Sequence, residues 1–258
     1  MRPLSFLPLA VAALMVSSAP AQTAASDEAR ALARLVPASE TLSFSIEWRL
    51  TRAGNARLNW AAGSSSGWQA SLSLQSAGLV SRLYKIDNEY SSVLTGQLCV
   101  TSALLKAHEG SRRRETRATF DGQRKKASLV ENDLVKNIVV NREIDILPCE
   151  HDVIGALYQL RVLNLEPGQS ASIPVSDGKK AAQARVEAQE RETVKIGSDT
   201  YKTIRYEAFL FNGVLYRRQA RVFVWLTDDP RRLPVQIRVR MPFYIGTVTL
   251  QIQKQGKS

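Results

Sequence analysis

The sequence predicts a mostly β protein: a large curved antiparallel sheet, or a barrel-like β-domain, built from hairpins. Hydrophobic and polar residues alternate along many short segments, which is typical of strands that bury one face. Asp-Gly and Asn-Gly pairs separate several of these segments, and such pairs accept the positive φ angles of tight hairpin turns. At a usual strand length of about 5–6 residues, we expect roughly a dozen strands or more.

The N-terminus has the pattern of a signal peptide. Arg2 precedes an apolar run over residues 4–16, and Ala19 and Ala21 lie at the spacing that a signal peptidase requires. The run is too short to cross about 30 Å of hydrocarbon, and no later run approaches about 18 apolar residues. We therefore expect residues 1–21 to be removed and the chain to work in the periplasm or as a secreted protein, without a transmembrane segment.

Three further parts are expected after the signal peptide. Residues 22–40 form a short helix and linker, with Ser26 as the helix cap. Residues 41–253 form a single β-rich domain, and residues 254–258 form a tail.

Hairpin turns are expected at four pairs of residues in the β-rich domain. The first is Gly54-Asn55, between alternating segments. The others are Asp121-Gly122, Asp177-Gly178 and Asn212-Gly213, the last leading directly into a strand from residue 214.

One internal segment has the period of a helix instead of a strand. Val153, Leu157 and Leu160 recur at helical spacing, and Asp152 is placed to cap the first turn. The sequence therefore predicts one internal helix near residues 152–163, packed on the sheet.

The two cysteines, Cys99 and Cys149, are expected to form a disulfide, because disulfides persist outside the cytoplasm. Such a bond would stabilise the fold by about 4 kcal/mol on chain-entropy grounds. The alternative is a reactive or metal-binding Cys149 beside His151 and Asp152, which needs a free thiolate. The chain lacks a recognisable zinc-ligand spacing, and no cofactor motif is present.

The chain is basic, with 35 Lys and Arg against 24 Asp and Glu, a formal net charge of +11. Outside the cytoplasm this favours anionic partners such as lipid head groups, lipopolysaccharide or acidic glycans, and argues against nucleic acid. Two clusters flank the Asp121-Gly122 turn, and we expect the hairpin to bring them together. They either bind anions or protect a sheet edge from mispairing. The clusters comprise Arg112, Arg113, Arg114, Arg117, Arg124, Lys125 and Lys126.

No set of residues in the sequence forms a coherent catalytic group. Residues 63–67 match G-x-S-x-G, but a nucleophile elbow needs a helix after the turn, and residues 68–74 alternate as a strand. His108-Glu109 is a weak acid–base candidate, because neighbouring residues of a strand point to opposite faces. His151-Asp152 is weak because it lies where a helix is expected to start, with Asp152 as its cap. Asp228-Asp229-Pro230 has the composition of a turn.

The second half of the chain resembles an uncharacterised exported bacterial family, the domain-of-unknown-function 3108 family. The resemblance rests on Pro148-Cys149, residues 156–161, residues 173–180, residues 225–229 and Ile245-Gly246-Thr247. It implies a β-rich fold outside the cytoplasm and no assigned activity. Its landmarks, expected to be structural, are Asp152, Tyr158, Arg161, Asp177, Gly178, Trp225, Asp228, Asp229, Arg232 and Pro234.

Three functions follow from the sequence. The leading hypothesis is a non-enzymatic envelope protein that binds an amphipathic or anionic component in the concavity of its sheet. The second is a scaffold or assembly factor that pairs a sheet edge with a protein partner. The third is a hydrolase that uses Ser65 or an acid pair.

We predict that the exported protein begins at Gln22. Mass spectrometry of the chain recovered from the periplasm or the medium should give the mass of residues 22–258. A mass that retains residues 1–21 would contradict the prediction.

Overall fold

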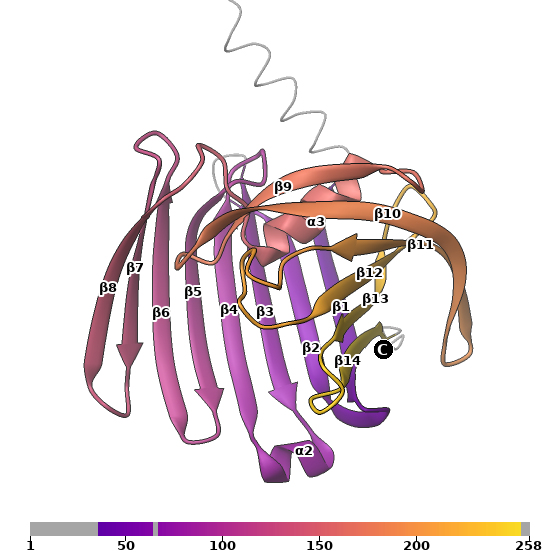
Figure 1. The fold of residues 1–258 in the computed structure, drawn as a ribbon, viewed down its shortest axis with the longest axis horizontal. Coiled ribbons are helices and arrows are strands. Elements are labelled where there is room, and N and C mark those ends of the chain that lie inside the picture. Colours follow the sequence, from indigo (N-terminus) through magenta and orange to yellow (C-terminus); the bar gives the residue numbers. More distant parts are fainter. Residues whose placement is uncertain (1–35, 64–66, 254–258) are drawn as a thin grey trace, which may run out of the picture.

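A computed structural model describes residues 36–63 and 67–253 of the chain, and these residues form one 14-stranded antiparallel sheet. The predicted fold class is therefore confirmed: the protein is mostly β, built from hairpins, with a curved sheet (Figure 1). The strands are β1 (Ser39–Trp48), β2 (Thr51–Ala62), β3 (Trp68–Ser76), β4 (Ile86–Leu94), β5 (Val100–Glu109), β6 (Arg112–Asp121), β7 (Lys126–Asp133), β8 (Ile138–Asp145), β9 (Ser170–Ser176), β10 (Ala181–Ile196), β11 (Asp199–Ala208), β12 (Arg221–Thr227), β13 (Pro234–Arg240) and β14 (Thr247–Ile252).

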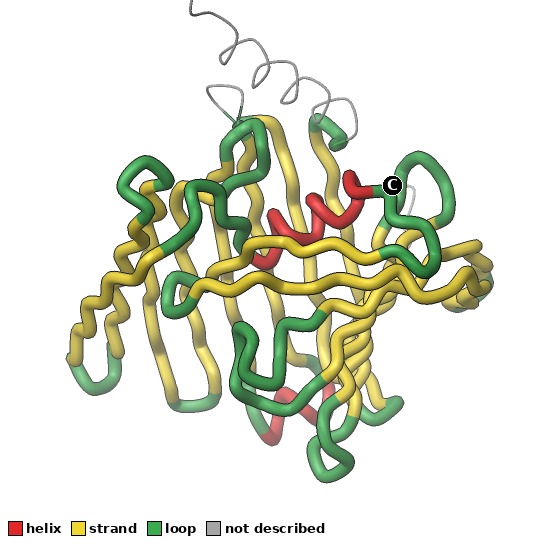
Figure 2. The backbone as a smooth tube through the Cα atoms, turned by 45° about the horizontal axis from the view of Figure 1, so that its top comes forward, coloured by secondary structure: helices red, strands yellow, loops and turns green. Residues whose placement is uncertain are grey.

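The chain enters the sheet in the middle and builds it in two directions. Strands β1 to β8 are added one after another until β8 forms one edge. The chain then crosses to the other edge, starts again with β9, and returns until β14 pairs with β1. The sheet does not close, because β8 and β9 are its two ends. Figures 1 and 2 show β9 and β10 running across the first half of the sheet.

The crossing segment contains the helix α3 (Val153–Leu163), which lies inside the curve of the sheet (Figure 1). Ile154 and Tyr158 belong to the hydrophobic core of the first half, and Leu160 belongs to the core of the second half. The Tyr158 ring stacks on Trp60 with a centroid distance of 3.7 Å. One helix therefore supplies apolar surface to both halves of the sheet.

The predicted internal helix is confirmed, and its N-cap is Asp152, whose side chain accepts a hydrogen bond of 2.6 Å from the Gly155 backbone nitrogen. A second helix, α2 (Gly78–Leu83), was not predicted. It has only six residues and none of them is buried, so it leaves no hydrophobic period in the sequence. The signal peptide and residues 22–35 of the predicted helix and linker lie outside the described part of the chain. The end of that predicted linker, residues 39 and 40, belongs to β1.

The first hairpin turn is at Arg49-Leu50, not at Gly54-Asn55 as the sequence suggested. Both turn residues have positive φ, 50° and 65°. Gly54 lies inside β2, where a Cβ would come 2.3 Å from the Gln75 carbonyl oxygen. Glycine is needed there because the two strands approach closely. In the sequence, a glycine of this kind cannot be told from a turn glycine.

The other three predicted turns are present, with one correction. The carboxylates of Asp121 and Asp177 each accept two backbone N–H groups of their turns. Asn212 and Gly213 both have positive φ, 60° and 93°. The strand after them, β12, begins at Arg221 and not at residue 214, so this connection is a loop and not a tight hairpin.

Cys99 and Cys149 form the expected disulfide, with a Cα–Cα distance of 5.0 Å. It joins the residue before β5 to the crossing segment. The crossing segment also forms two backbone hydrogen bonds to strands. Glu150 O accepts from Val100 N of β5 at 2.8 Å, and His151 N donates to Pro174 O of β9 at 2.9 Å. The crossing segment is therefore bonded to β5 and to the edge strand β9 at once.

Reduction of the disulfide should lower the free energy of unfolding by about 4 kcal/mol. The reason is that the bond links two residues 50 positions apart, and breaking it raises the conformational entropy of the unfolded chain. Urea unfolding with and without a phosphine reductant measures this difference. The Cys99→Ser/Cys149→Ser variant is the control, since its stability should match that of the reduced protein and should not respond to reductant. Equal stability of the oxidised and reduced forms would contradict the prediction.

Candidate binding cavity

The concave face of the sheet contains a cavity of about 420 Å³, which we name the inner cavity. Its walls are mostly apolar, with small side chains such as Ala103 and Ala118 at the centre of β5 and β6. These two alanines are paired across the strands, so the hollow lies where two short side chains meet. The lining residues are Leu72, Leu74, Asn88, Tyr90, Ala103, Leu105, Ala107, Arg114, Thr116, Ala118, Phe120, Glu131, Val153, Ile154, Ser176, Asp177, Lys179 and Tyr216.

The floor of the inner cavity is the sheet, and the roof comes from the second half of the chain. Alternation along β3 to β7 places every second side chain on the floor. The start of α3, the β9–β10 turn and Tyr216 form the roof. Gly178 in that turn has φ 78°, and a Cβ there would lie 2.9 Å from the Ala118 Cβ. The turn therefore rests directly on the floor at one side of the cavity.

Tyr90 and Asp152 join the floor to the roof. The Tyr90 hydroxyl donates a 2.7 Å hydrogen bond to the Asp152 carboxylate, which also caps α3. Burial raises the pKa of Tyr90 well above its usual value, and the charge of Asp152 raises it further. Tyr90 is therefore a permanent donor, and the bond holds the N-terminal end of α3 over the cavity.

A second link between floor and roof is the ion pair of Lys179 with Glu131. The hydrogen bond from Lys179 lowers the pKa of Glu131, more than its partial burial raises it. Glu131 is therefore an anion at neutral pH, and its charge is matched by that of Lys179.

Arg114 is the cation of the inner cavity with an unsatisfied donor. One terminal nitrogen, Nη2, lies 3.3 Å from Glu109 Oε2, and Glu109 also accepts from Asn88 at 3.0 Å. The Arg114 Nε atom is buried and has no hydrogen-bond partner. A buried unpaired donor costs about 1–3 kcal/mol, and an anionic group bound in the cavity would remove that cost.

The two basic clusters predicted as an anion site lie at opposite ends of β6. Arg112, Arg113 and Arg114 are at its start, and Arg124 to Lys126 surround its turn with β7. The ten residues of β6 span about 30 Å, so the expectation that the hairpin joins the clusters is wrong. A turn brings together the residues that adjoin it, and residues 112–114 pair instead with the far end of β7.

Three of the seven residues in these clusters pair with acids outside the inner cavity. Arg117 pairs with Glu115 at 2.7 Å, Arg124 with Asp121 at 2.8 Å, and Lys126 with Asp145 at 2.9 Å. Of the seven predicted residues, only Arg114 lines the cavity.

The landmark residues of the resemblance hold the other end of α3. Arg161 donates to both oxygens of Glu40, at 2.6 and 3.1 Å, and the Tyr158 hydroxyl donates to Glu40 at 2.9 Å. Arg232 is buried, donates to Asn164 Oδ1 at 2.5 Å and bonds the Tyr206 hydroxyl. These contacts fix the helix against both halves of the sheet.

The remaining landmarks lie in turns and strands. Asp229 accepts from the backbone nitrogens of Arg231 and Arg232, as expected of a turn, and Asp228 pairs with Arg191 at 2.9 Å. Trp225 donates to Glu192 at 2.6 Å, and Pro234 begins β13.

The structure does not assemble the enzymatic candidates. Gly63 and Gly67 close the β2–β3 hairpin, with Gly63 N bonded to Gly67 O at 2.8 Å, and a strand follows instead of a helix. Ser65 lies outside the described residues. The proposal of a free Cys149 thiolate is wrong, because Cys149 is in the disulfide.

The two histidines lie in different surroundings. His151 is buried with Nδ1 2.8 Å from the Leu98 carbonyl oxygen, and burial lowers its pKa. His108 is exposed on β5. In the described ranges, no group of three or more His, Cys, Asp and Glu side chains is placed to hold a metal ion. The same residues include no helix long and apolar enough to cross a membrane.

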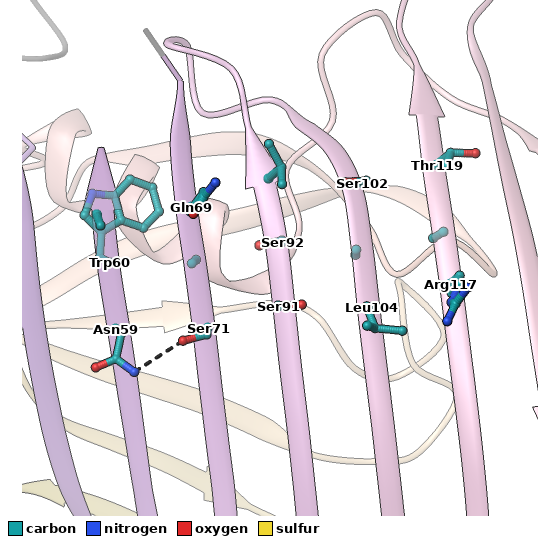
Figure 3. Close-up of a pocket in the computed structure, with 15 residues that line it drawn as sticks. Asn59, Trp60, Gln69, Ser71, Ser91, Ser92, Ser102, Leu104, Arg117 and Thr119 are labelled. Atoms are coloured by element: carbon teal, nitrogen blue, oxygen red, sulfur yellow. Dashed lines mark hydrogen bonds between the residues drawn. The ribbon is translucent and has the colours of Figure 1, made fainter. Parts of the chain in front are cut away.

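The outer face of the same strands has a separate recess of about 550 Å³, which we name the outer recess (Figure 3). Asn59, Ser71, Leu104 and Arg117 project from this face, and the Trp60 ring lies behind it, in the core. Asn59 donates to Ser71 at 3.3 Å. Its lining comes only from residues 59–119, so the second half of the chain does not cover it as it covers the inner cavity.

Comparison with protein families gives one match: residues 43–253 match the family described as "Protein of unknown function (DUF3108)". The chain belongs to the DUF3108 family. This confirms the resemblance stated from the sequence, and it assigns no activity to the DUF3108 chain. No curated protein sequence matches the chain.

Two solved structures are similar to the DUF3108 chain at low sequence identity. The "Beta-barrel-like Protein of Domain of Unknown Function DUF1849" from Brucella abortus has 8% identity and a TM-score of 0.54, and the match covers 83% of this chain and 95% of that one. It supports the fold alone. A DUF1089 family protein from Pseudomonas aeruginosa has 11% identity, 78% and 89% coverage, and a TM-score of 0.27, too low to support an argument.

The residues that form the inner cavity were mostly missed by sequence reasoning. Tyr90, Leu105 and Glu131 carry no motif, and their strands alternate as any half-buried strand does. They lie close together only through the pairing of β4 to β7 and the return of β9 over them.

Proposed function

We propose that this DUF3108 protein is exported to the cell envelope and binds an amphipathic molecule without changing it chemically. The apolar part of the molecule occupies the inner cavity, and its anionic head group lies at Arg114. The observation that carries the proposal is the cavity itself: a mostly apolar hollow with one buried, unpaired cationic donor on its wall.

The size and composition of the inner cavity support this choice of ligand. Small-molecule sites usually measure about 300–1,000 Å³ and combine apolar walls with few polar groups. A volume of about 420 Å³ is at the lower end of that range, which favours a ligand with one acyl chain over a lipid with several. The signal peptide expected at residues 1–21 supports the choice as well, because export would bring the protein to envelope lipids.

Filling the inner cavity should abolish binding. Leu105→Trp adds a large ring to the floor, whereas Leu104→Trp adds the same ring to the outer face of the same strand. Protein purified from the periplasm should retain an amphiphile that native mass spectrometry detects, and Leu105→Trp should lose it while Leu104→Trp keeps it. Circular dichroism verifies that both variants fold.

A wild-type protein that carries no amphiphile and binds no fluorescent fatty acid would overturn the proposal. Equal binding by the two tryptophan variants would place the ligand elsewhere.

The charge of Arg114 should select the head group. Arg114→Met keeps an unbranched apolar stem and removes the cation, so affinity for a fatty-acid carboxylate should fall about ten- to a hundredfold, the usual effect of one charge-assisted hydrogen bond. Affinity for an uncharged alcohol of the same chain length should stay within a few-fold. Arg117→Met, on the outer face of the same strand, is the control and should bind both ligands as the wild type does.

The second candidate function is strand addition at β8. This strand is an edge of the sheet, and Ile138 and Val139 are 51% and 58% exposed at its start. An extended peptide can pair with such an edge. The charged residues Arg142, Glu143 and Asp145 along β8 instead resemble the protection that edge strands carry against pairing. Strand addition at β8 would leave both tryptophan variants fully functional, which distinguishes it from the first candidate.

A further inference from the structure

One end of the sheet carries large apolar side chains in solvent. The turns at residues 49–50, 77–85 and 241–246 all lie at this end, because β1, β3 and β13 run toward it (Figures 1 and 2). Leu50 is 94% exposed, Phe243 is 97% exposed and Tyr244 is 76% exposed. We propose that this end, the docking end, binds the surface of a bilayer that contains anionic lipid, with these side chains inserted between the head groups.

Arg49 holds the backbone of the loop that carries Phe243 and Tyr244. Its guanidinium donates to the carbonyl oxygens of Phe243, Tyr244 and Ile245, at 3.2, 2.5 and 3.3 Å. Trp48 Nε1 donates to Ile245 O at 2.8 Å as well. Because the backbone of this loop is held inward by four hydrogen bonds, its two aromatic side chains are directed outward.

The Leu50 position is strained as well as exposed. Leu50 has φ 65° and the preceding Arg49 has φ 50°, a conformation that residues other than Gly, Asn and Asp rarely adopt. Glycine or asparagine would form this turn at lower cost. A bulky leucine at the tip costs stability and contributes no packing, which indicates that its side chain serves a contact outside the chain.

The helix α2 extends the apolar surface of the docking end. It begins beside β2, where Ala77 N bonds Ala53 O at 2.8 Å, so it is next to the Leu50 turn. Leu79 and Leu83 are 66% and 76% exposed, and the helix buries none of its residues. Exposed apolar groups gathered in this way, with polar residues around them, mark membrane or protein contact sites.

The charge at the docking end favours an anionic membrane. Counted with one strand residue on each side, the turns at this end are residues 48–51, 76–86, 109–112, 133–138 and 240–247, and they contain six Lys or Arg and two acidic residues. At the opposite end of the same strands, residues 94–100, 121–126 and 145–153 contain four acidic and three basic residues. Lys and Arg near an anionic leaflet attract the protein to it, and aromatic and leucine side chains then anchor it.

The docking end and the inner cavity are independent features. Ala107 and Arg114, paired partners on the cavity wall, lie near the β5–β6 turn that belongs to this end. A protein docked in this way would hold its cavity close to the lipid surface. Leu105→Trp should nevertheless bind vesicles normally, so failure of the cavity proposal is distinguishable from failure of this one.

Co-sedimentation with vesicles tests the docking end. The protein is purified from the periplasm, so that residues 1–21 are absent and their apolar run cannot bind lipid. It should bind vesicles of phosphatidylcholine with phosphatidylglycerol, and bind pure phosphatidylcholine much more weakly. Leu50→Ser, Phe243→Ser and Tyr244→Ser should each lower the partition coefficient roughly tenfold, the effect of withdrawing one large apolar side chain. The control is Leu147→Ser, an exposed leucine at the opposite end, which should bind as the wild type does.

A matched pair of charge variants tests the electrostatic part. Arg82→Glu/Lys85→Glu at the docking end and Arg142→Glu/Lys195→Glu elsewhere change the net charge equally, and all four residues are exposed. Only the first pair should lose binding to anionic vesicles. The wild type should lose binding as salt is raised, because salt screens exposed charges.

Absence of vesicle binding by the wild type, or equal loss in both charge variants, would overturn the proposal. Self-association that Phe243→Ser abolishes, without any lipid binding, would assign this end to a second copy of the chain instead.

Discussion

The structure depends on how the helix α3 is held inside the curve of an open sheet. The two edge strands of this open sheet, β8 and β9, are not hydrogen-bonded to each other. Other contacts must therefore fix the distance between the β1–β8 half and the β9–β14 half. Here α3 contributes Tyr158 to one core and Leu160 to the other. Its N-terminal end is bonded through Asp152 to Tyr90, and its C-terminal turn is bonded through Arg161 to Glu40.

The inner cavity is a consequence of that arrangement. The helix covers the first half of the sheet near β1 to β3, where large residues such as Trp60 fill the space beneath it. Over β5 and β6 the floor residues are alanines, and the roof is supported by Lys179 on Glu131 and by Gly178 on Ala118. The space that remains has mostly apolar walls, and the unpaired Nε atom of Arg114 lies on one of them.

The basic residues are not spread evenly over the chain. Their positions say more about where an anion could bind than the net charge does. Arg117, Arg124 and Lys126 are paired with acids. Arg161 and Arg221 are also paired, with Glu40 and Glu207, and stabilise the fold. The turns at the docking end have more basic than acidic residues, and the Arg114 Nε has no hydrogen-bond partner in the cavity. Net charge alone pointed to an anionic partner and did not locate where one would bind.

The sequence alone determined the class of the fold, the helix at residues 153–163, the disulfide and the family, because each depends on local periodicity, on chain composition or on motif order. It misplaced the Gly54 turn, since a glycine required for close approach of β2 to Gln75 has the same appearance as a turn glycine. Tertiary structure alone decided that Tyr90, Arg114 and Glu131 share a cavity and that Leu50 lies beside Phe243. The physical reason is that strand pairing and the return of β9 bring together residues far apart in the chain. A local sequence pattern contains no information about contacts between such distant residues.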